Sequence, residues 1–416
     1  MKPGQPRPGA LVLLLFLTLL NVLNFTDRFL IQGFSVDMIR DLHLSKLEFT
    51  LLTGFVFTGF YTLMGLAMGA LADRLHRPRL MAAGLLLWSA LTAATGTVSN
   101  FGQAAAVRLV TGVGEATLTP AALGMLGEVF SPRRRAMAAG FYYLGSPVGI
   151  AGAFILAGTI GAQMGWRLCF VLLGGIGLVF SLGLLLVREP RDKRECALPA
   201  RAMDGSLLRE LFSVLGSSPA LVFVIAGSVC VIFAQGTYVL DQLWLVQERG
   251  FTKGHAQSLS GLMFLFGGVL GAVAGGVASD AMAARIRGGR LYFLALAYGA
   301  GIPISFVYRL VDPGGIVFLV SMFCGSVMIT IGYGAMFASV QDLAPLHLCS
   351  TVTAFFILCM TLLGTSPGNL AVGWLSELFA KTGHLDPITD AALLASSVWL
   401  LAIPCFVLAA KATKTS

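Results

Sequence analysis

Charged residues are scarce in this sequence. They make up 12% of the 416 residues, whereas soluble domains carry about 25%. This supply cannot cover a water-exposed surface, so the composition excludes an ordinary soluble enzyme, a disordered chain and a coiled coil. Hydrophobic residues make up 56% of the chain, and the mean hydropathy is +0.84. These values are typical of a protein whose main solvent is lipid.

Residues that bind metals or form disulfides are few and scattered. The seven cysteines occur singly, and the five histidines show no ligand spacing. We therefore expect cysteines that pack in the interior, no metal site and no cofactor. The sequence also lacks a Walker motif and a legible Ser/His/Asp constellation, which argues against an ATP-driven pump and against an enzyme.

Long apolar segments account for most of the chain. A membrane-spanning helix needs roughly 20 apolar residues, and twelve segments meet this requirement. They lie near residues 10–34, 46–72, 80–98, 101–127, 136–162, 166–187, 218–246, 257–281, 290–310, 315–342, 349–377 and 390–411. We predict an all-α membrane protein of twelve transmembrane helices in two pseudo-symmetric six-helix bundles. The amino-terminal bundle covers 1–187, a cytoplasmic linker 188–217, and the carboxy-terminal bundle 218–416.

The net charge of +8 would suggest nucleic acid as a partner in a soluble protein. With both termini in the cytoplasm, the cytoplasmic loops hold 19 Lys and Arg residues and the outer loops hold 7, Arg309 among them. Basic residues favour the cytoplasmic side of membrane proteins, so this excess reports topology and no nucleic acid is expected. We predict a monomeric, multi-pass protein of the cell membrane with both termini cytoplasmic.

The two halves of the chain repeat short patterns. Gly69-Ala-Leu-Ala-Asp73 returns about half the chain length later as Gly276-Val-Ala-Ser-Asp280, and Gly145-Ser-Pro147 is echoed by Gly364-Thr-Ser-Pro367. Duplicated halves joined by a polar connector are the layout of many transporters. In such proteins the binding site lies near mid-membrane between the halves, which is where we expect it.

The loop Gly69-Ala-Leu-Ala-Asp73-Arg74-Leu-His-Arg77-Pro-Arg79 resembles the signature between helices 2 and 3 of the major facilitator superfamily, with His in place of the usual second Gly. The stretch from Arg108 to Ala116 resembles a second motif of that superfamily. The resemblance implies alternating access, with Gly69, Asp73, Arg74 and Arg77 gating the cytoplasmic side. A simple turn with topogenic charges is the alternative interpretation of this loop.

A narrower resemblance lies in the first half of the chain. Asn24-Phe-Thr-Asp27-Arg28 and Gly112-Val-Gly-Glu115-Ala resemble the N-Y-x-D-R and G-x-G-E-A patterns of the Spinster family, with Phe25 replacing the common Tyr. The resemblance implies a lipid substrate, such as a lysophospholipid or a sphingosine-1-phosphate-like lipid.

Four charged residues fall inside apolar segments: Asp27, Arg28, Arg108 and Glu115. A charge at the bilayer centre costs about 2.5–3.5 kcal/mol on insertion scales, so these side chains must be paired or face water. Helical depth predicts that Asp27 pairs with Arg108, and that Glu115 and Arg28 approach each other. We assign proton coupling to the two acids and substrate binding to the two arginines and Asn24. A static ion-pair lock is the alternative.

In the span 218–246, Tyr238 shares a helical face with Asp241 or Gln242. We add Tyr238 to the substrate-binding residues, although an exposed helix end explains this cluster nearly as well. Taken together, the sequence predicts a proton-coupled secondary transporter that moves an amphiphilic anion through the lipid bilayer. The alternative is a proton-linked antiporter of drugs or small metabolites on the same fold.

Overall fold

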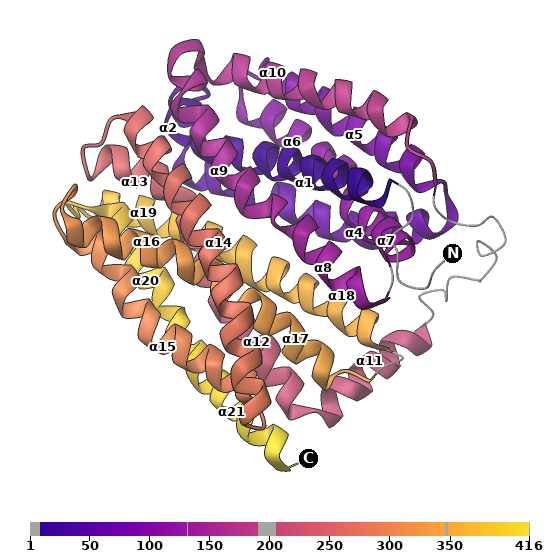
Figure 1. Cartoon of the computed structure of the whole chain (residues 1–416). Helices are drawn as coiled ribbons and strands as arrows, with labels where there is room; N and C mark the ends of the chain where they lie inside the picture. Colours follow the sequence, from indigo (N-terminus) through magenta and orange to yellow (C-terminus); the bar gives the residue numbers. More distant parts are fainter. Residues whose placement is uncertain (1–8, 131, 190–204, 346–347, 416) are drawn as a thin grey trace. The chain divides into compact units, whose positions relative to one another are not determined.

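The computed structural model describes residues 9–130, 132–189, 205–345 and 348–415, and within these ranges the chain is helical and contains no strand (Figure 1). The predicted all-α membrane class is confirmed. In the part of the chain that the structure describes, eleven helical segments are long and apolar enough to cross a membrane. The predicted span at 80–98 corresponds to α5, Arg77–Thr95, which is not among the eleven because its first turn, Arg77-Pro78-Arg79, is polar.

The chain forms two compact units. Unit 1 contains the described residues within 1–44, 56–202 and 253–261, and unit 2 those within 45–55, 203–252 and 262–416. The predicted boundaries at 187 and 217 stay predictions. Of the predicted linker, residues 190–204 lie outside the described part of the chain, and α11, Gly205–Ser217, follows them.

The helices of unit 1 are α1 (Ala10–Gly33), α2 (Ser35–Asp41), α4 (Phe60–Arg74), α6 (Phe101–Glu115), α7 (Leu118–Val129), α8 (Pro132–Tyr143), α9 (Gly145–Gly158) and α10 (Ile160–Leu185), together with α5. The π-helix η1 (Leu52–Gly59) begins in unit 2 and ends in unit 1.

Unit 2 contains α3 (Lys46–Leu51), α12 (Pro219–Gly236), η3 (Thr237–Leu240), α13 (Asp241–Gln247), α15 (Gly289–Leu310), α16 (Ile316–Ile331), α17 (Tyr333–Leu343), α18 (Cys349–Cys359), η5 (Met360–Thr365), α19 (Ser366–Lys381), α20 (Pro387–Ser396), η6 (Ser397–Leu401) and α21 (Ala402–Thr415), with α11. Helix α14 (Lys253–Arg285) begins in unit 1 and continues in unit 2.

Several membrane spans are broken helices. The span 101–129 consists of α6 and α7, and the span 219–247 consists of α12, the 3₁₀ turn η3 and α13. Transporters commonly place their binding sites at such breaks, because the interrupted backbone lines a cavity there. Glu115 is the last residue of α6, and Asp241 is the first residue of α13.

Small residues bring α9 against α1 in unit 1 (Figure 1). A Cβ built at Gly149 would lie 2.5 Å from the carbonyl oxygen of Val22 and 2.7 Å from the Cβ of Phe25, so only glycine fits there. The hydroxyl of Thr26 donates to the Gly149 carbonyl at 3.1 Å. This packing, typical of membrane helices, fixes the rotation of α1 and hence the direction of its charged side chains.

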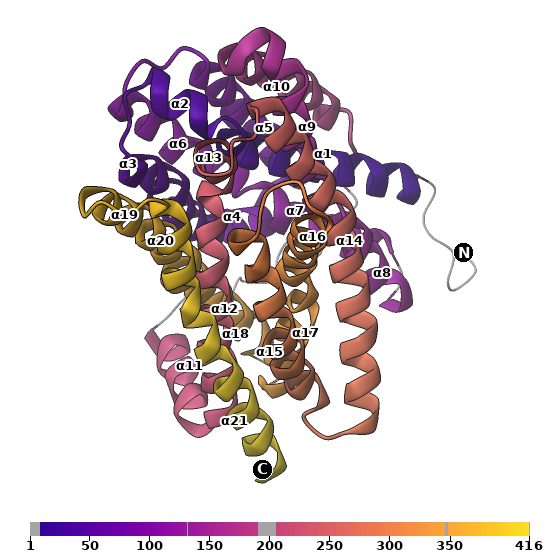
Figure 2. The same cartoon turned by 90° about the vertical axis from the view of Figure 1, so that its left-hand side faces the viewer.

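Unit 2 has an apolar core in which α12 and α15 pack against α21 (Figure 2). Val224, Leu294, Tyr298, Trp399 and Phe406 are buried in this core. Rings of Tyr298 and Trp399 lie 5.7 Å apart, a distance typical of aromatic pairs. The core therefore holds the carboxy-terminal helices as one packed body.

Candidate functional site

The four predicted intramembrane charges lie together in unit 1. Arg28 donates from Nε and Nη2 to one carboxylate oxygen of Glu115, at 3.2 and 2.8 Å. The predicted approach of Arg28 and Glu115 is therefore observed. The Glu115 side chain is fully buried, whereas 19% of the Arg28 side chain is exposed. Asn24 accepts a longer bond from Arg28 Nη2 at 3.4 Å, which adds a third contact to this guanidinium.

The predicted pair between Asp27 and Arg108 is not formed. Asp27 accepts a 2.8 Å hydrogen bond from the hydroxyl of Thr92 on α5. Arg108 instead donates to the backbone carbonyl of Arg28 at 3.4 Å, and its Cζ lies 4.4 Å from the Phe57 ring. Helical depth placed Asp27 and Arg108 at a similar level, but the rotation of the helices and the Thr92 donor decide the contact.

Aromatic rings surround the guanidinium of Arg28, whose side chain is partly exposed. Its Cζ lies 5.1 Å from the rings of Phe25 and Phe57 and 4.3 Å from the ring of Tyr61. Each distance is within the range of cation–π attraction. Phe57 and Tyr61 were not predicted as site residues. The arrangement joins a cationic group to apolar surfaces in one place.

Gly112 explains how these rings reach the site. A Cβ built there would lie 3.2 Å from the backbone nitrogen of Tyr61 and 3.3 Å from the carbonyl oxygen of Phe57. A larger residue would push η1 and α4 away from α6. The Gly-x-Gly pattern of the motif could have indicated such a close approach, but not which side chains it brings in.

Two carboxylate oxygens in the cluster have no hydrogen-bond partner in the structure: Asp27 Oδ2 and Glu115 Oε1. Both residues are buried, and their carboxyl groups interact electrostatically with each other. Buried polar atoms normally have a partner. A single proton shared by the two carboxyl groups would supply one.

The signature loop connects helices at one end of unit 1. Gly69 lies in α4, whose last residues are Asp73 and Arg74; the side chains of these two lie outside the described part of the structure. Arg77 is buried and pairs with Glu128 of α7 at 2.7 Å. The backbone N–H of Arg77 also donates to Glu189 at 2.6 Å. Arg77 is one of the four predicted gating residues, and it connects α5 with α7 and with the segment that follows α10.

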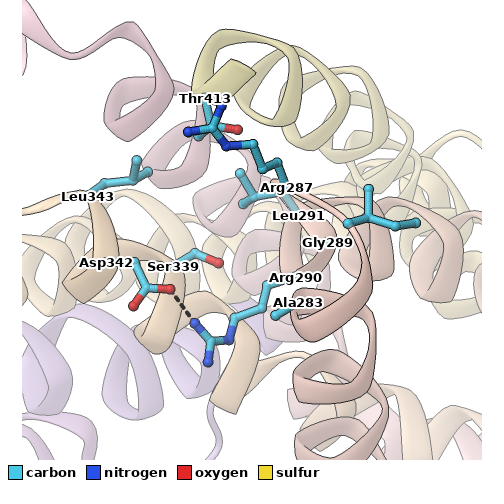
Figure 3. A pocket seen from close by; sticks show the side chains of 11 residues that line it. Ala283, Arg287, Gly289, Arg290, Leu291, Ser339, Asp342, Leu343 and Thr413 are labelled. Carbon is cyan, nitrogen blue, oxygen red and sulfur yellow. Dashed lines mark hydrogen bonds and ion pairs between the residues drawn. The ribbon is translucent and has the colours of Figure 1, made fainter. Parts of the chain in front are cut away.

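The repeat copy of the signature forms a matching contact in unit 2. Arg290 donates to Asp280 at 2.9 and 3.2 Å. Arg290 also pairs with Asp342 of α17 (Figure 3). Arg290 and Asp342 border a cavity of about 250 Å³ whose lining also includes Arg287 and Ser339. The second half of the chain therefore repeats the contact between an arginine at a helix start and an acidic residue, with different sequence spacing.

Tyr238, the predicted substrate residue of unit 2, lies in η3. Its ring is 5.9 Å from the Cζ of Arg309, which pairs with Asp241. The count of loop charges assigned Arg309 to an outer loop, and this was wrong: the side chain is buried, because Asp241 and aromatic rings enclose it. Because Arg309 lies at the end of an apolar span, the sequence did not indicate that its side chain is buried. Within the described residues, no group of His, Cys, Asp and Glu could hold a metal ion.

Comparison with known proteins gives one family and several relatives. The protein-family model described as Major Facilitator Superfamily matches residues 17–369 of this chain. An MFS-type efflux pump of Mycolicibacterium smegmatis is 28% identical over 363 residues, covering 87% of this chain and 83% of the pump. Protein spinster of Drosophila melanogaster is 24% identical, covering 89% of this chain and 62% of its own. A hexuronate transporter of Bacillus subtilis is 25% identical, covering 83% of each.

The fold has a solved counterpart. The crystal structure of a bacterial homologue of the human lysosomal transporter Spinster, in an inward-facing and unoccupied conformation, matches with a TM-score of 0.84. The match covers 99% of both chains at 21% identity. The helical arrangement is therefore shared with that protein.

Proposed function

Because the chain belongs to the Major Facilitator Superfamily, we propose that it is a proton-coupled secondary transporter of an amphiphilic organic anion. It is a membrane transporter similar to Spinster proteins and not an enzyme. The observation that carries the proposal is the Arg28–Glu115 pair, in which the base is partly exposed and the acid fully buried.

The partly exposed member of the Arg28–Glu115 pair determines which kind of ligand the pair can bind. An anion that approaches the pair meets the guanidinium of Arg28, which offers parallel donors to a phosphate or a carboxylate. The rings of Phe25, Phe57 and Tyr61 lie against the same guanidinium and can contact an apolar part of the substrate. A lysophospholipid or a sphingosine-1-phosphate-like lipid has both parts. Asn24, Arg108 and Tyr238 complete the proposed set of substrate-binding residues.

Proton coupling follows from competition for Arg28. An anion bound to this guanidinium weakens its hold on Glu115, and a buried carboxylate that loses its counter-ion favours the protonated form. Asp27, which interacts electrostatically with Glu115 and also has an unpartnered oxygen, is the second acceptor. Substrate and proton then bind together, so that a proton gradient drives uptake of the anion.

A second candidate function is transport of a small organic anion or a drug. The hexuronate transporter is named for a sugar acid, and the mycobacterial relative is named as an efflux pump. The match with this chain covers 83% of each of these two relatives, but 62% of the Drosophila spinster. A sugar acid would use the arginines but not the aromatic surfaces.

The gating proposal concerns Gly69, Asp73, Arg74 and Arg77. Arg77 is held by Glu128, and breaking that pair removes a charged contact between α5 and α7. We propose that these residues stabilise the closed state of one membrane side. Cytoplasmic termini and a monomeric state accompany this proposal as predictions.

The test is flux into proteoliposomes under an imposed pH gradient. Labelled lysophospholipid, sphingosine-1-phosphate and hexuronate serve as probes. We expect gradient-driven uptake of an amphiphile, lost roughly tenfold or more in Arg28→Lys because lysine cannot donate in a bidentate way. Asp27→Asn should abolish the proton-driven component. Arg40→Gln is the matched control, since the Arg40 side chain is 66% exposed and lies outside the cluster.

The outcomes separate the candidates. Uptake of hexuronate alone would replace the lipid proposal with the sugar-acid one. Gradient-independent uptake in the wild type, or an unchanged pH dependence in Asp27→Asn, would remove proton coupling through Asp27. No flux of any probe would overturn the proposed substrate classes.

A further inference from the structure

We propose that Asp241 is a further proton-binding residue, located in unit 2, with Arg309 as its fixed counter-ion. The role of this residue in transport rests on the proton coupling proposed above. The site itself concerns a different acid in a different unit, and it can be tested without any substrate.

Asp241 is held at a helix break. It is the first residue of α13 and directly follows the 3₁₀ turn η3. One carboxylate oxygen pairs with Arg309 near the end of α15, and the other accepts from the Tyr308 hydroxyl at 3.2 Å. Gln247 ends α13 six residues later, so Asp241 lies about 9 Å inside the end of the span 219–247. The carboxylate is therefore an intramembrane charge, and such residues commonly have a functional role.

Arg309 cannot leave this position easily. Only 2% of its side chain is exposed, and its Cζ lies 4.9 Å from the Trp244 ring and 5.0 Å from the Tyr308 ring. Its backbone carbonyl also accepts a hydrogen bond from Arg249. An anionic ligand approaching from solvent could not reach this guanidinium without displacing the aromatic rings.

The two intramembrane pairs differ in which member is exposed. In unit 2 the acid is the exposed partner, with 17% of the Asp241 side chain accessible against 2% for Arg309. In unit 1 the base is exposed, with 19% for Arg28 against 0% for Glu115. A ligand that reaches the unit 2 pair therefore meets a carboxylate first. Both oxygens of this carboxylate already have a partner, Arg309 and Tyr308. A proton is the ligand that a single carboxylate in this position can still bind.

The charged and titratable groups around Asp241 are consistent with this assignment. Arg309 and Tyr308 face it from α15, and Tyr238 lies on η3. Beyond them, Glu248 is engaged with the first turn of α20, where it accepts from the backbone N–H groups of Ile388 and Thr389 at 2.6 and 2.9 Å. Glu248 thus has its own partners and is not needed as the counter-ion of Arg309.

Protonation would change the helix break. A proton on Asp241 replaces an ion pair with a neutral hydrogen bond and leaves Arg309 buried without its counter-ion. The link between α13 and α15 then weakens at the point where η3 interrupts the span. Proton uptake in unit 2 would in this way loosen a broken helix that also carries Tyr238.

The experiment is infrared difference spectroscopy of the purified full chain during a pH titration. We expect a carboxyl stretching band that rises as the pH falls, is absent in Asp241→Asn, and is retained in Asp312→Asn. Asp312 is a suitable control because it is an exposed acid just beyond α15. Tyr308→Phe keeps the carboxyl group but removes a donor to its charged form, so the band midpoint should move upward by about one pH unit.

Each outcome decides the question. A band unchanged in folded Asp241→Asn, or a midpoint unmoved in Tyr308→Phe, overturns the proton site. If Asp241→Asn does not fold, the Tyr308→Phe titration alone carries the test. Failure of all transport probes together with a normal Asp241 band overturns the proposed function and leaves this site standing. Transport without the band overturns the site and leaves the proposed function standing.

Discussion

Gly114 makes a close helix contact on which the charge cluster depends. A Cβ built at Gly114 would lie 2.7 Å from the Gly84 carbonyl oxygen, 2.9 Å from the Trp88 Cβ and 3.0 Å from the Trp88 nitrogen. All three atoms belong to the backbone of α5 or lie directly on it, so none can move aside as a flexible side chain would. Gly114→Ala must therefore push α6 away from α5.

The expected magnitude has two opposing parts. Overpacking of a close contact costs typically about 1–3 kcal/mol. Replacing glycine in a helix gains up to about 1 kcal/mol from helix propensity, and less here because Gly114 is next to the last residue of α6. The net effect is destabilisation of about 1–2 kcal/mol. For a unit of roughly 200 residues this lowers the melting midpoint by roughly 2–4 °C for each kcal/mol.

The matched control is Gly175→Ala in α10. A Cβ at Gly175 has no neighbour within 4 Å, so this variant gains propensity without any clash. Thermal unfolding of both variants in the same detergent isolates the steric cost. Because Glu115 directly follows Gly114, the Gly114→Ala variant should also transport more slowly. A Gly114→Ala protein that melts at or above the Gly175→Ala protein would refute the contact argument.

Two further predictions concern charges at the edges of unit 1. Trp166 donates to Asp41 at 3.0 Å, and this bond holds the pKa of the carboxyl below its usual value. The bond therefore stabilises the fold at pH values above the unfolded-state pKa of Asp41. This stabilisation is lost as the pH falls through the folded-state pKa. Trp166→Phe should therefore melt lower than wild type at neutral pH, with a difference that shrinks below about pH 4; a pH-independent difference would contradict this. Glu128→Gln leaves the buried Arg77 without its carboxylate and should cost about 1–3 kcal/mol in thermal unfolding. An unchanged midpoint would show that this pair contributes nothing.

The candidate charges of unit 1 could be predicted from the sequence alone. Asp27, Arg28, Arg108 and Glu115 stand out because lipid makes unpaired charge costly. The approach of Arg28 to Glu115 also followed from the sequence. The Gly-x-Gly pattern of the second motif could have indicated a close helix approach at Gly112, but only the structure shows that Phe57 and Tyr61 are brought in there.

The partners of Asp27 and Arg309 required the tertiary structure. Thr92 is one of many threonines, and nothing in its local sequence distinguishes it as the donor to Asp27. Arg309 sits at the end of an apolar span, where basic residues are usually solvated. Only the packing of Trp244 and Tyr308 around it shows that it is buried.

The sequence by itself determined the class of molecule, because a chain with 12% charged residues and long apolar segments can satisfy its backbone only as membrane helices. It also identified the four charged side chains of unit 1 that lie in apolar segments, Asp27, Arg28, Arg108 and Glu115, but not the burial of Arg309 beside Asp241. The tertiary structure decided how those charges pair and which member of each pair is exposed. The physical reason is that helical periodicity defines the face and depth of a residue within one helix, whereas its partner depends on the rotation and packing of the neighbouring helices.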